Sequence, residues 1–277
     1  MAQEWLVESP RVLDIGGDGE RVRELKVGVV GGHVDVVTHS DSPTARVEVS
    51  AIEGTPLKVT WDGTALKVTH GAEGEGVLGK LKQWVTLPDR NRVTLSISVP
   101  EDARATVGTV SASGLLAGLR SPARVNTVSG TITLDDVAGA VDVNTVSGEV
   151  ECGHLHGPLR VNSVSGAVTA QASDLPEVEI NTVSGDVTLD LTNASSRIAS
   201  HSVSGDVTVR APHDGYDVRA STATGQVVID GQKVHRRDSG QRLTAGARAL
   251  HLDASAVSGN VVVLQATTAR AGDGAPA

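Results

Sequence analysis

Val125-Asn126-Thr127-Val128-Ser129-Gly130-Thr131-Ile132-Thr133-Leu134 begins a motif that returns at nearly constant spacing along the chain. The Gly of each copy stands at positions 130, 148, 166, 185, 205, 225 and 259, so the steps are 18, 18, 19, 20, 20 and 34 residues. A fixed period of about 20 residues is typical of one structural unit stacked on itself. The architecture therefore follows from what one repeat needs from its neighbours.

Three apolar columns emerge when the copies are aligned on this Gly. They lie two residues before it, two after it and four after it, with mostly Thr, Asp, Glu, Gln or Asn between them. The members are Val128, Val146, Val164, Val183, Val203, Ala223 and Val257, then Ile132, Val150, Val168, Val187, Val207, Val227 and Val261, and then Leu134, Cys152, Ala170, Leu189, Val209, Ile229 and Val263. Alternation with period 2 predicts strands with one buried face, so all three columns are expected to point inward. One repeat cannot bury enough apolar surface alone, and the prediction is an all-β, single-stranded β-solenoid (β-helix) with about 18–20 residues per coil.

The polar positions of the repeat have structural explanations. A Ser-Gly pair between two short strands predicts a corner, because Gly accepts positive φ without steric cost. Four residues before the Gly stand Asn126, Asn144, Asn162 and Asn181, followed by His201 and Ser221. Amides stacked at the strand spacing of about 4.8 Å can bond along the axis, which predicts an asparagine ladder. A row of Asn facing a ligand is the alternative; the change to His and Ser where the coils lengthen favours the ladder.

Composition supports a narrow solenoid and excludes several classes of function. The 277 residues include no Phe, three Trp, one Tyr and one Met, whereas Gly is frequent at 31. The 24 basic and 33 acidic residues leave a formal charge of −9, which disfavours nucleic acid and anionic membranes as partners. A single cysteine excludes an intramolecular disulfide. Because no signal peptide, sorting signal or membrane-spanning run is apparent, the expected location is cytoplasmic.

The chain divides into three expected regions. Residues 1–100 form an N-terminal β section. Within it, residues 1–24 are a lead-in that can cap the open end, and Val27–Val36 is an early coil. Residues 46–99 are an antiparallel meander with a turn at Asp62-Gly63-Thr64 and a mobile loop at 71–83. Residues 101–265 are the solenoid. The 34-residue step from Gly225 to Gly259 indicates a basic insertion at about 232–247. Residues 266–277 are expected to be a disordered tail.

The repeated Asn-Thr-Val-Ser-Gly-Asp-Val-Thr-Leu pattern, as at 181–189, resembles the bacterial DUF4097 family, the β-strand-repeat "putative adhesin" domain. The resemblance covers about residues 25–265. It implies the solenoid architecture and suggests a role in cell-envelope stress, but the family has no established catalytic or ligand-binding residues to carry over. The adhesin label rests on analogy of fold.

Three groups of residues are candidate sites, and each also has a plain structural explanation. Cys152, His154 and His156 alternate and could gather as zinc ligands, but Cys152 falls in an inward column, and a core cysteine beside two exposed histidines is the expected arrangement. Asp186 and Asp206 could stack one rung apart, although their column is mixed. In the insertion, Lys233, His235, Arg236, Arg237 and Arg242 could contact an anion or an acidic partner; a solvated loop is the alternative.

These observations lead to one function hypothesis and two alternatives. The chain is expected to be a non-enzymatic interaction module without a cofactor, a monomer or weak homo-oligomer whose partner is a protein or a second copy of itself. A self-assembling, bactofilin-like cytoskeletal scaffold is the first alternative, since stacked coils with open ends can polymerise. A carbohydrate-active β-helix enzyme is the least favoured, because no catalytic motif and few aromatic residues are present.

Overall fold

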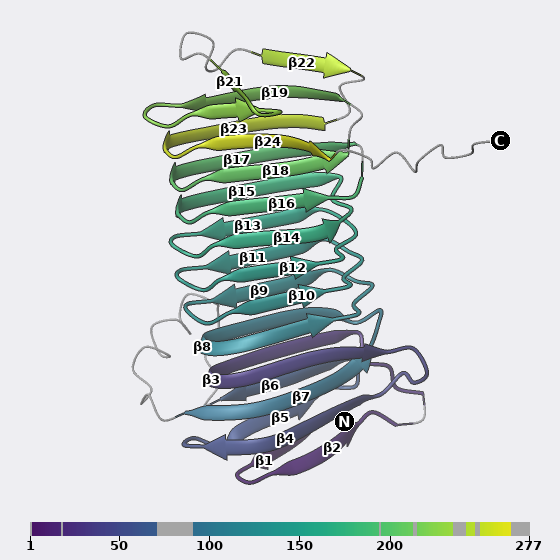
Figure 1. Cartoon of the computed structure of the whole chain (residues 1–277). Helices are drawn as coiled ribbons and strands as arrows, with labels where there is room; N and C mark the ends of the chain where they lie inside the picture. Colours follow the sequence, from purple (N-terminus) through teal and green to yellow (C-terminus); the bar gives the residue numbers. More distant parts are fainter. Residues whose placement is uncertain are drawn as a thin grey trace, which may run out of the picture.

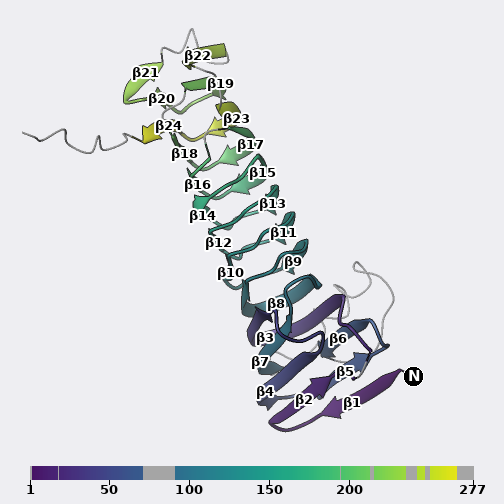
Figure 2. The ribbon, with the colours of Figure 1, turned by 90° about the vertical axis from the view of Figure 1, so that its right-hand side faces the viewer.

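The computed structural model describes residues 2–17, 19–70, 91–193, 195–212, 215–234, 242–246 and 250–266. In these ranges every regular element is a strand, and 24 strands form one hydrogen-bonded sheet wound into an elongated stack (Figures 1 and 2). No helix occurs among the described residues, and hence none that could cross a membrane. The predicted all-β solenoid is confirmed. The loop expected at 71–83 and the tail from 267 lie outside the described residues.

The N-terminal section is built in two layers. Its strands are β1 (Gln3–Val7), β2 (Arg11–Ile15), β3 (Glu24–His39), β4 (Ala45–Glu53), β5 (Leu57–Trp61), β6 (Ala65–His70) and β7 (Arg92–Pro100). β1, β5 and β6 pair antiparallel in one layer, and β2, β4 and β7 pair antiparallel in the other. β3 runs parallel to β6 with its first half and to β7 with its second. The expected meander is therefore divided, because β4 and β5 are consecutive in sequence but enter different layers.

β3 connects this section to the solenoid. It pairs parallel with β8 (Arg104–Ala117) in a register that places Val27 beside Val107 and Val36 beside Leu116. Val107 in turn lies beside Val125 of the next coil. The segment Val27–Val36, expected to be an early coil, thus lies in register beside β8. β1 and β2 lie at the N-terminal end of the stack (Figure 1).

From β9 onward each coil adds one strand to each of two parallel sheets. The first sheet continues through β9 (Ala123–Thr127), β11 (Val141–Thr145), β13 (Leu159–Ser163), β15 (Glu177–Ser184) and β17 (Ser196–Ser204). The second continues through β10 (Ile132–Asp135), β12 (Val150–Gly153), β14 (Val168–Ser173), β16 (Val187–Leu191) and β18 (Val207–Pro212). The tight turns between the two strands of each coil follow one long edge, at the left in Figure 1.

Two of the three apolar columns point inward as predicted, and the third does not. Every member of the columns two and four residues after the Gly is buried, from Ile132 and Leu134 to Val261 and Val263. In the column two residues before the Gly, however, five valines are 46–55% exposed. The prediction that this column lines the core is wrong.

A hydroxyl residue takes the inward position that was assigned to valine. Strict alternation along β11 turns Val143 inward, Asn144 outward and Thr145 inward, so the following Val146 points out. The buried Thr145 hydroxyl accepts the N–H of Gly148 at 2.8 Å, and the Ser163 hydroxyl accepts the N–H of Gly166 at 2.9 Å. These bonds satisfy a turn N–H that would otherwise be unpaired beside the core, and a valine could not supply them.

The Gly column is required mainly by close stacking. A Cβ on Gly166 would lie 1.9 Å from the carbonyl oxygen of Gly148, and one on Gly148 would lie 2.3 Å from that of Gly130. Of the seven repeat glycines only Gly130, Gly205 and Gly259 have positive φ. The expected need for positive φ therefore applies to those three, while the approach of the neighbouring coil excludes a side chain at the others.

The last coils do not stack in sequence order. After β18 the chain forms β19 (Gly215–Thr222), β20 (Val227–Ile229), β21 (Gln232–Val234), β22 (Arg242–Gly246), β23 (Leu250–Ser258) and β24 (Val261–Ala266). β23 lies between β17 and β19, and β24 lies between β18 and β20, all parallel (Figure 1). β21 and β22 pair antiparallel with β20 and β19 and cover the end of the stack. The Gly259 coil is therefore last in the sequence but lies inside the stack, between two coils that precede it.

Candidate functional site

A row of exposed valines follows the turn edge of the stack. We name Val146, Val164, Val183, Val203 and Val257 the valine ridge; each is about half exposed. Consecutive members belong to adjacent coils, about 4.8 Å apart, so the side chains form a continuous apolar strip. Contiguous exposed apolar surface of this kind is typical of binding surfaces.

Turn serines hold the backbone beneath the first valines of the ridge. The N–H of Ser147 donates to the carbonyl of Val128 at 2.8 Å, and its hydroxyl donates to the same oxygen at 3.1 Å. Ser165 repeats both contacts with Val146 at 2.8 and 3.2 Å. Because both groups of each serine engage the preceding coil, the ridge is a preorganised surface.

The asparagine column runs beside the ridge. The Nδ2 group of Asn144 donates to Asn126 Oδ1 at 3.2 Å, Asn162 donates to Asn144 at 2.9 Å and Asn181 donates to Asn162 at 3.2 Å. His201 continues the column and its Nδ1 lies 2.8 Å from the Ser255 hydroxyl, in the rung filled by β23.

Between the column and the ridge lies an open groove of about 340 Å³. Its lining includes the side chains of Asn162, Asn181 and His201 on the polar side and Val183 and Val203 on the apolar side. His201 is the one ionisable residue in the lining of the groove, and the other lining residues are Asn, Ser, Thr and Val, so the surface suits a partner with apolar and amide-bonding groups.

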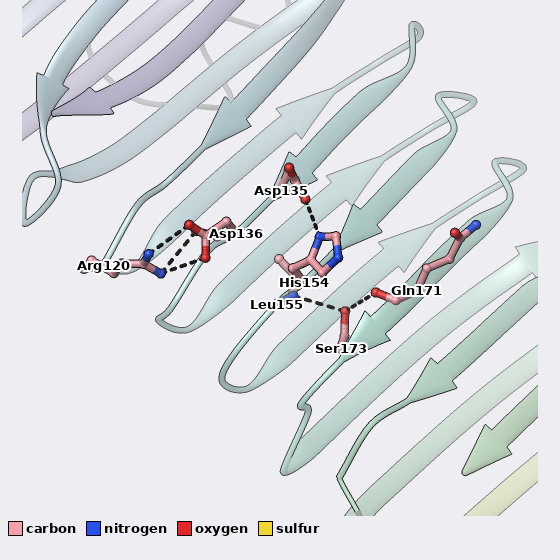
Figure 3. A network of polar contacts seen from close by, with 7 residues as sticks. All are labelled: Arg120, Asp135, Asp136, His154, Leu155, Gln171 and Ser173. Atoms are coloured by element: carbon pink, nitrogen blue, oxygen red, sulfur yellow. Dashed lines mark hydrogen bonds and ion pairs between the residues drawn. The ribbon is translucent and has the colours of Figure 1, made fainter. Parts of the chain in front are cut away.

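The zinc candidates are not brought together. Cys152 is buried in the core, and burial raises the pKa of its thiol to about 12, with a smaller contribution from Glu151. His154 and His156 point outward from the loop side of the coil, and His154 Nδ1 lies 2.9 Å from Asp135 Oδ1 (Figure 3). Among the described residues no three His, Cys, Asp or Glu side chains are placed to hold a metal ion.

The polar network around His154 connects neighbouring coils. Arg120 makes two hydrogen bonds to Asp136, at 2.9 and 2.8 Å, and this pairing holds the pKa of Asp136 below its usual value (Figure 3). The Ser173 hydroxyl accepts the N–H of Leu155 at 3.1 Å. Each contact joins one rung to the next, which explains these residues as structural.

The acidic pair Asp186 and Asp206 also bonds to the backbone. Asp186 Oδ1 accepts the N–H of Asp206 at 2.9 Å, and Asp206 Oδ1 accepts the N–H of Asn260 at 2.7 Å. These carboxylates therefore connect the turns of adjacent coils.

The anion candidates are only partly described. Lys233 lies exposed on β21, whereas His235, Arg236 and Arg237 lie outside the described residues. Arg242 extends from β22 to Asp217, whose side chain is 5% exposed, and donates Nε–H to Asp217 Oδ1 at 2.6 Å and a second hydrogen bond to Oδ2. The hydrogen bond raises the pKa of Arg242. The structure thus places Arg242 and Lys233 in different sheets.

Sequence reasoning missed the charged residues around Arg242. Arg219 and Asp253 belong to the column six residues before the Gly, and Arg197 and His251 lie two positions earlier on their strands. The signal was available, because that column reads Arg124, Asp142, Arg160, Glu179, Ala199, Arg219 and Asp253 and alternates in sign over its first four members.

Comparisons with known proteins extend the description of the chain. The model of the family described as Toastrack DUF4097 matches residues 29–264. No curated protein matches the sequence.

Three solved structures match this chain at low identity. A "putative cell adhesion protein" from Clostridium sporogenes is 11% identical with a TM-score of 0.30, covering 93% of this chain and 100% of that one. A "putative lipid binding protein" from Parabacteroides distasonis is 14% identical with a TM-score of 0.46, covering 93% and 95%. A "putative adhesin" from the same organism is 14% identical with a TM-score of 0.48, covering 92% and 97%. Similarity of this extent identifies neither a ligand nor an activity.

Proposed function

The chain belongs to the Toastrack DUF4097 family, and we propose that it is a non-enzymatic interaction module that binds a protein partner along the valine ridge. The observation that carries the proposal is the row of five half-exposed valines at consecutive rungs. Burying such a strip would contribute about 25 cal/mol for each Å² of apolar surface removed from water.

The chemistry beside the ridge favours a protein over other partners. Valine, serine and amide side chains offer apolar contact and neutral hydrogen bonding, whereas nucleic acid requires a basic surface. The formal charge of −9 acts in the same direction. A protein segment with alternating apolar and polar side chains would match both walls of the groove.

The ends of the stack favour an interaction module over a self-assembling scaffold. β1 and β2 at one end, and β21 and β22 at the other, each pair antiparallel with the strand beneath them. Coils within the stack pair parallel and in register. Head-to-tail growth would therefore require unlike end strands to continue a parallel stack.

The test uses two matched triple variants. Val146→Lys, Val164→Lys and Val183→Lys place three charges on the ridge, whereas Thr169→Lys, Thr188→Lys and Thr208→Lys place three on the outer face of the second sheet. Each immobilised protein is exposed to lysate of the native host, and light scattering measures self-association. We expect a defined protein to be retained by the wild type and the threonine variant and lost from the valine variant.

The same experiment can contradict the proposal. If all three proteins retain the same set, or if the threonine variant loses the partner equally, the ridge is not the binding surface. A wild-type dimer that the valine variant alone dissociates would identify a second copy as the partner. The cytoplasmic location and the link to envelope stress are proposals from sequence, and fractionation of host cells would test the location.

A further inference from the structure

A second surface feature lies at the C-terminal end of the first sheet, away from the ridge. A hollow of about 430 Å³ opens on the outer face of β17, β23 and β19, beneath β22. Its walls include Arg197, Arg219, Arg242, His251, Asp217 and Asp253. Ile198, Ala199 and Leu252 complete the lining.

The hollow exists because a regular ladder of ion pairs is interrupted there. Lower in the stack Arg124 pairs with Asp142 at 3.0 Å, and Arg160 pairs with Glu179, each bridging two rungs. The next position in this column is Ala199, whose methyl group leaves the space that long charged side chains fill elsewhere. The inserted β23 then places Asp253 between Ala199 and Arg219.

Among the side chains that line the hollow, positive charge exceeds negative charge, and Glu177 of β15 lies just outside the lining, beside Arg197. Three guanidinium groups face two carboxylates, and Asp217 is already engaged by Arg242, with His251 Nδ1 at 3.4 Å. Among the described residues neither Arg197 nor Arg219 forms an ion pair. Arg219 also lies directly opposite Arg242 in the antiparallel pair of β19 and β22, an arrangement of like charges that is unfavourable by itself. A bound anion would remove that cost.

We propose that this hollow binds a phosphate group through Arg197 and Arg219, with His251 as a third donor. Guanidinium groups present paired N–H donors that match the oxygens of an oxyanion. The three donors stand on the adjacent strands β17, β23 and β19 and line the same hollow. A tetrahedral phosphate has enough oxygens to accept hydrogen bonds from all three donors, whereas the two oxygens of a planar carboxylate are satisfied by the paired N–H groups of one guanidinium. The phosphate can be the free ion or a monoester on a larger molecule.

The experiment measures binding of inorganic phosphate and of phosphoserine by calorimetry at constant ionic strength. The test variant combines Arg197→Gln with Arg219→Gln, and the control is Arg104→Gln, an exposed arginine at the other end of the same sheet. We expect saturable binding to wild type and control, weakened at least about tenfold in the test variant. Phosphoserine binding would indicate a monoester, and binding of inorganic phosphate alone would indicate the free ion.

Other outcomes would overturn the proposal. These are no binding of either probe to the wild type, equal weakening in the Arg104 variant, or binding of acetate in place of both phosphates. Thermal melting of each variant checks folding. A second variant, Arg219→Lys, retains the positive charge but loses the paired N–H donors of the guanidinium group. Its affinity for phosphate should fall between those of the wild type and the double variant. An affinity equal to that of the wild type would contradict bidentate recognition.

Discussion

Thr145 and its counterparts show how one atom of a side chain decides the direction of its neighbours. The threonine hydroxyl closes the turn by accepting the N–H of Gly148, and the strand alternation then directs Val146 to solvent. Two valines of one coil, Val183 and Val187, consequently have opposite environments, at 49% and 1% exposure. The two valines are only four positions apart in the sequence.

This pair supplies a direct test of the inward and outward assignments. We expect Val187→Asp to lower the free energy of unfolding by several kcal/mol, because it places a carboxylate in an apolar interior. Val183→Asp, the matched control, should change it by no more than about 0.5 kcal/mol. Denaturant titration of both variants measures the difference. Equal losses would show that the ridge valines are buried.

His70 provides a pH-dependent prediction at the same scale. Its ring is 3% exposed, and burial lowers its pKa to about 4 from 6.5, while Nδ1 accepts the N–H of Val30 at 3.4 Å. Between these two pKa values the unfolded chain binds a proton that the folded chain does not, so stability decreases as the pH falls from about 6.5 towards 4. The full shift corresponds to a loss of about 3 kcal/mol.

The pH effect is separable from other titrations by substitution. We expect His70→Gln to remove this part of the stability decrease in denaturant titrations at pH 7, 6, 5 and 4.5. Thr188→Gln, at an exposed residue that does not titrate, serves as the control and should retain the wild-type slope through that range. A wild-type slope in the His70 variant would mean that the pKa of His70 is not lowered in the folded wild-type protein.

At the scale of the element, the turn between the two strands of a coil is shaped by its neighbour. The glycine column allows the carbonyl of one turn to lie where a side chain of the next would stand. The same approach lets the serine N–H and hydroxyl reach the preceding valine carbonyl. The turn is therefore defined by stacking as much as by local backbone preference.

Gly166→Ala should show this dependence on stacking. The added methyl would lie 1.9 Å from the Gly148 carbonyl oxygen, so the coils must separate locally, at a cost of about 1–3 kcal/mol. Gly17→Ala is the control, because a Cβ there meets nothing within 4 Å, and it should change stability by less than about 0.5 kcal/mol. Thermal melting or denaturant titration compares the two; similar small changes would indicate loosely stacked turns.

At the scale of the whole molecule, the C-terminal coil is enclosed by parts of the chain that precede it. β23 pairs with β17 on one side and with β19 on the other. In sequence, β19 to β22 come between β17 and the strand that lies beside it. The last coil therefore joins the long stack to its terminal cap.

Leu252→Asp tests this order of coils. Leu252 is 2% exposed, and a charge there should disrupt β23 and remove the partner on which β19 lies. Hydrogen exchange should then become faster in β19, although it precedes the substitution in sequence, while β9 to β13 keep their protection. If the coils stacked in sequence order, β19 would rest on β17 and remain protected.

Much of the architecture was predictable from sequence because each coil pairs with a near copy of itself. The period, the two inward columns at Ile132 and Leu134, the early coil at Val27 and the alignment of Asn126 with Asn144 all follow from in-register parallel pairing. A repeat carries that information locally, since residue and partner stand about one period apart. For this protein the sequence by itself determined the length of each coil, its two inward columns and its in-register pairing with the next coil.

The tertiary structure decided the features that depend on distant partners. The outward direction of Val146 follows from a hydroxyl closing the turn, which hydrophobic pattern alone does not reveal. The position of β23 brings Ser255 beside His201 across 54 residues, and no repeat spacing specifies that a later coil fills an earlier gap. The gathering of Arg197, Arg219 and His251 follows from that insertion. Pairing within the stack follows from the similarity between the sequences of successive coils. The order of the last rungs depends instead on the strand edges of β17 and β19, between which β23 pairs.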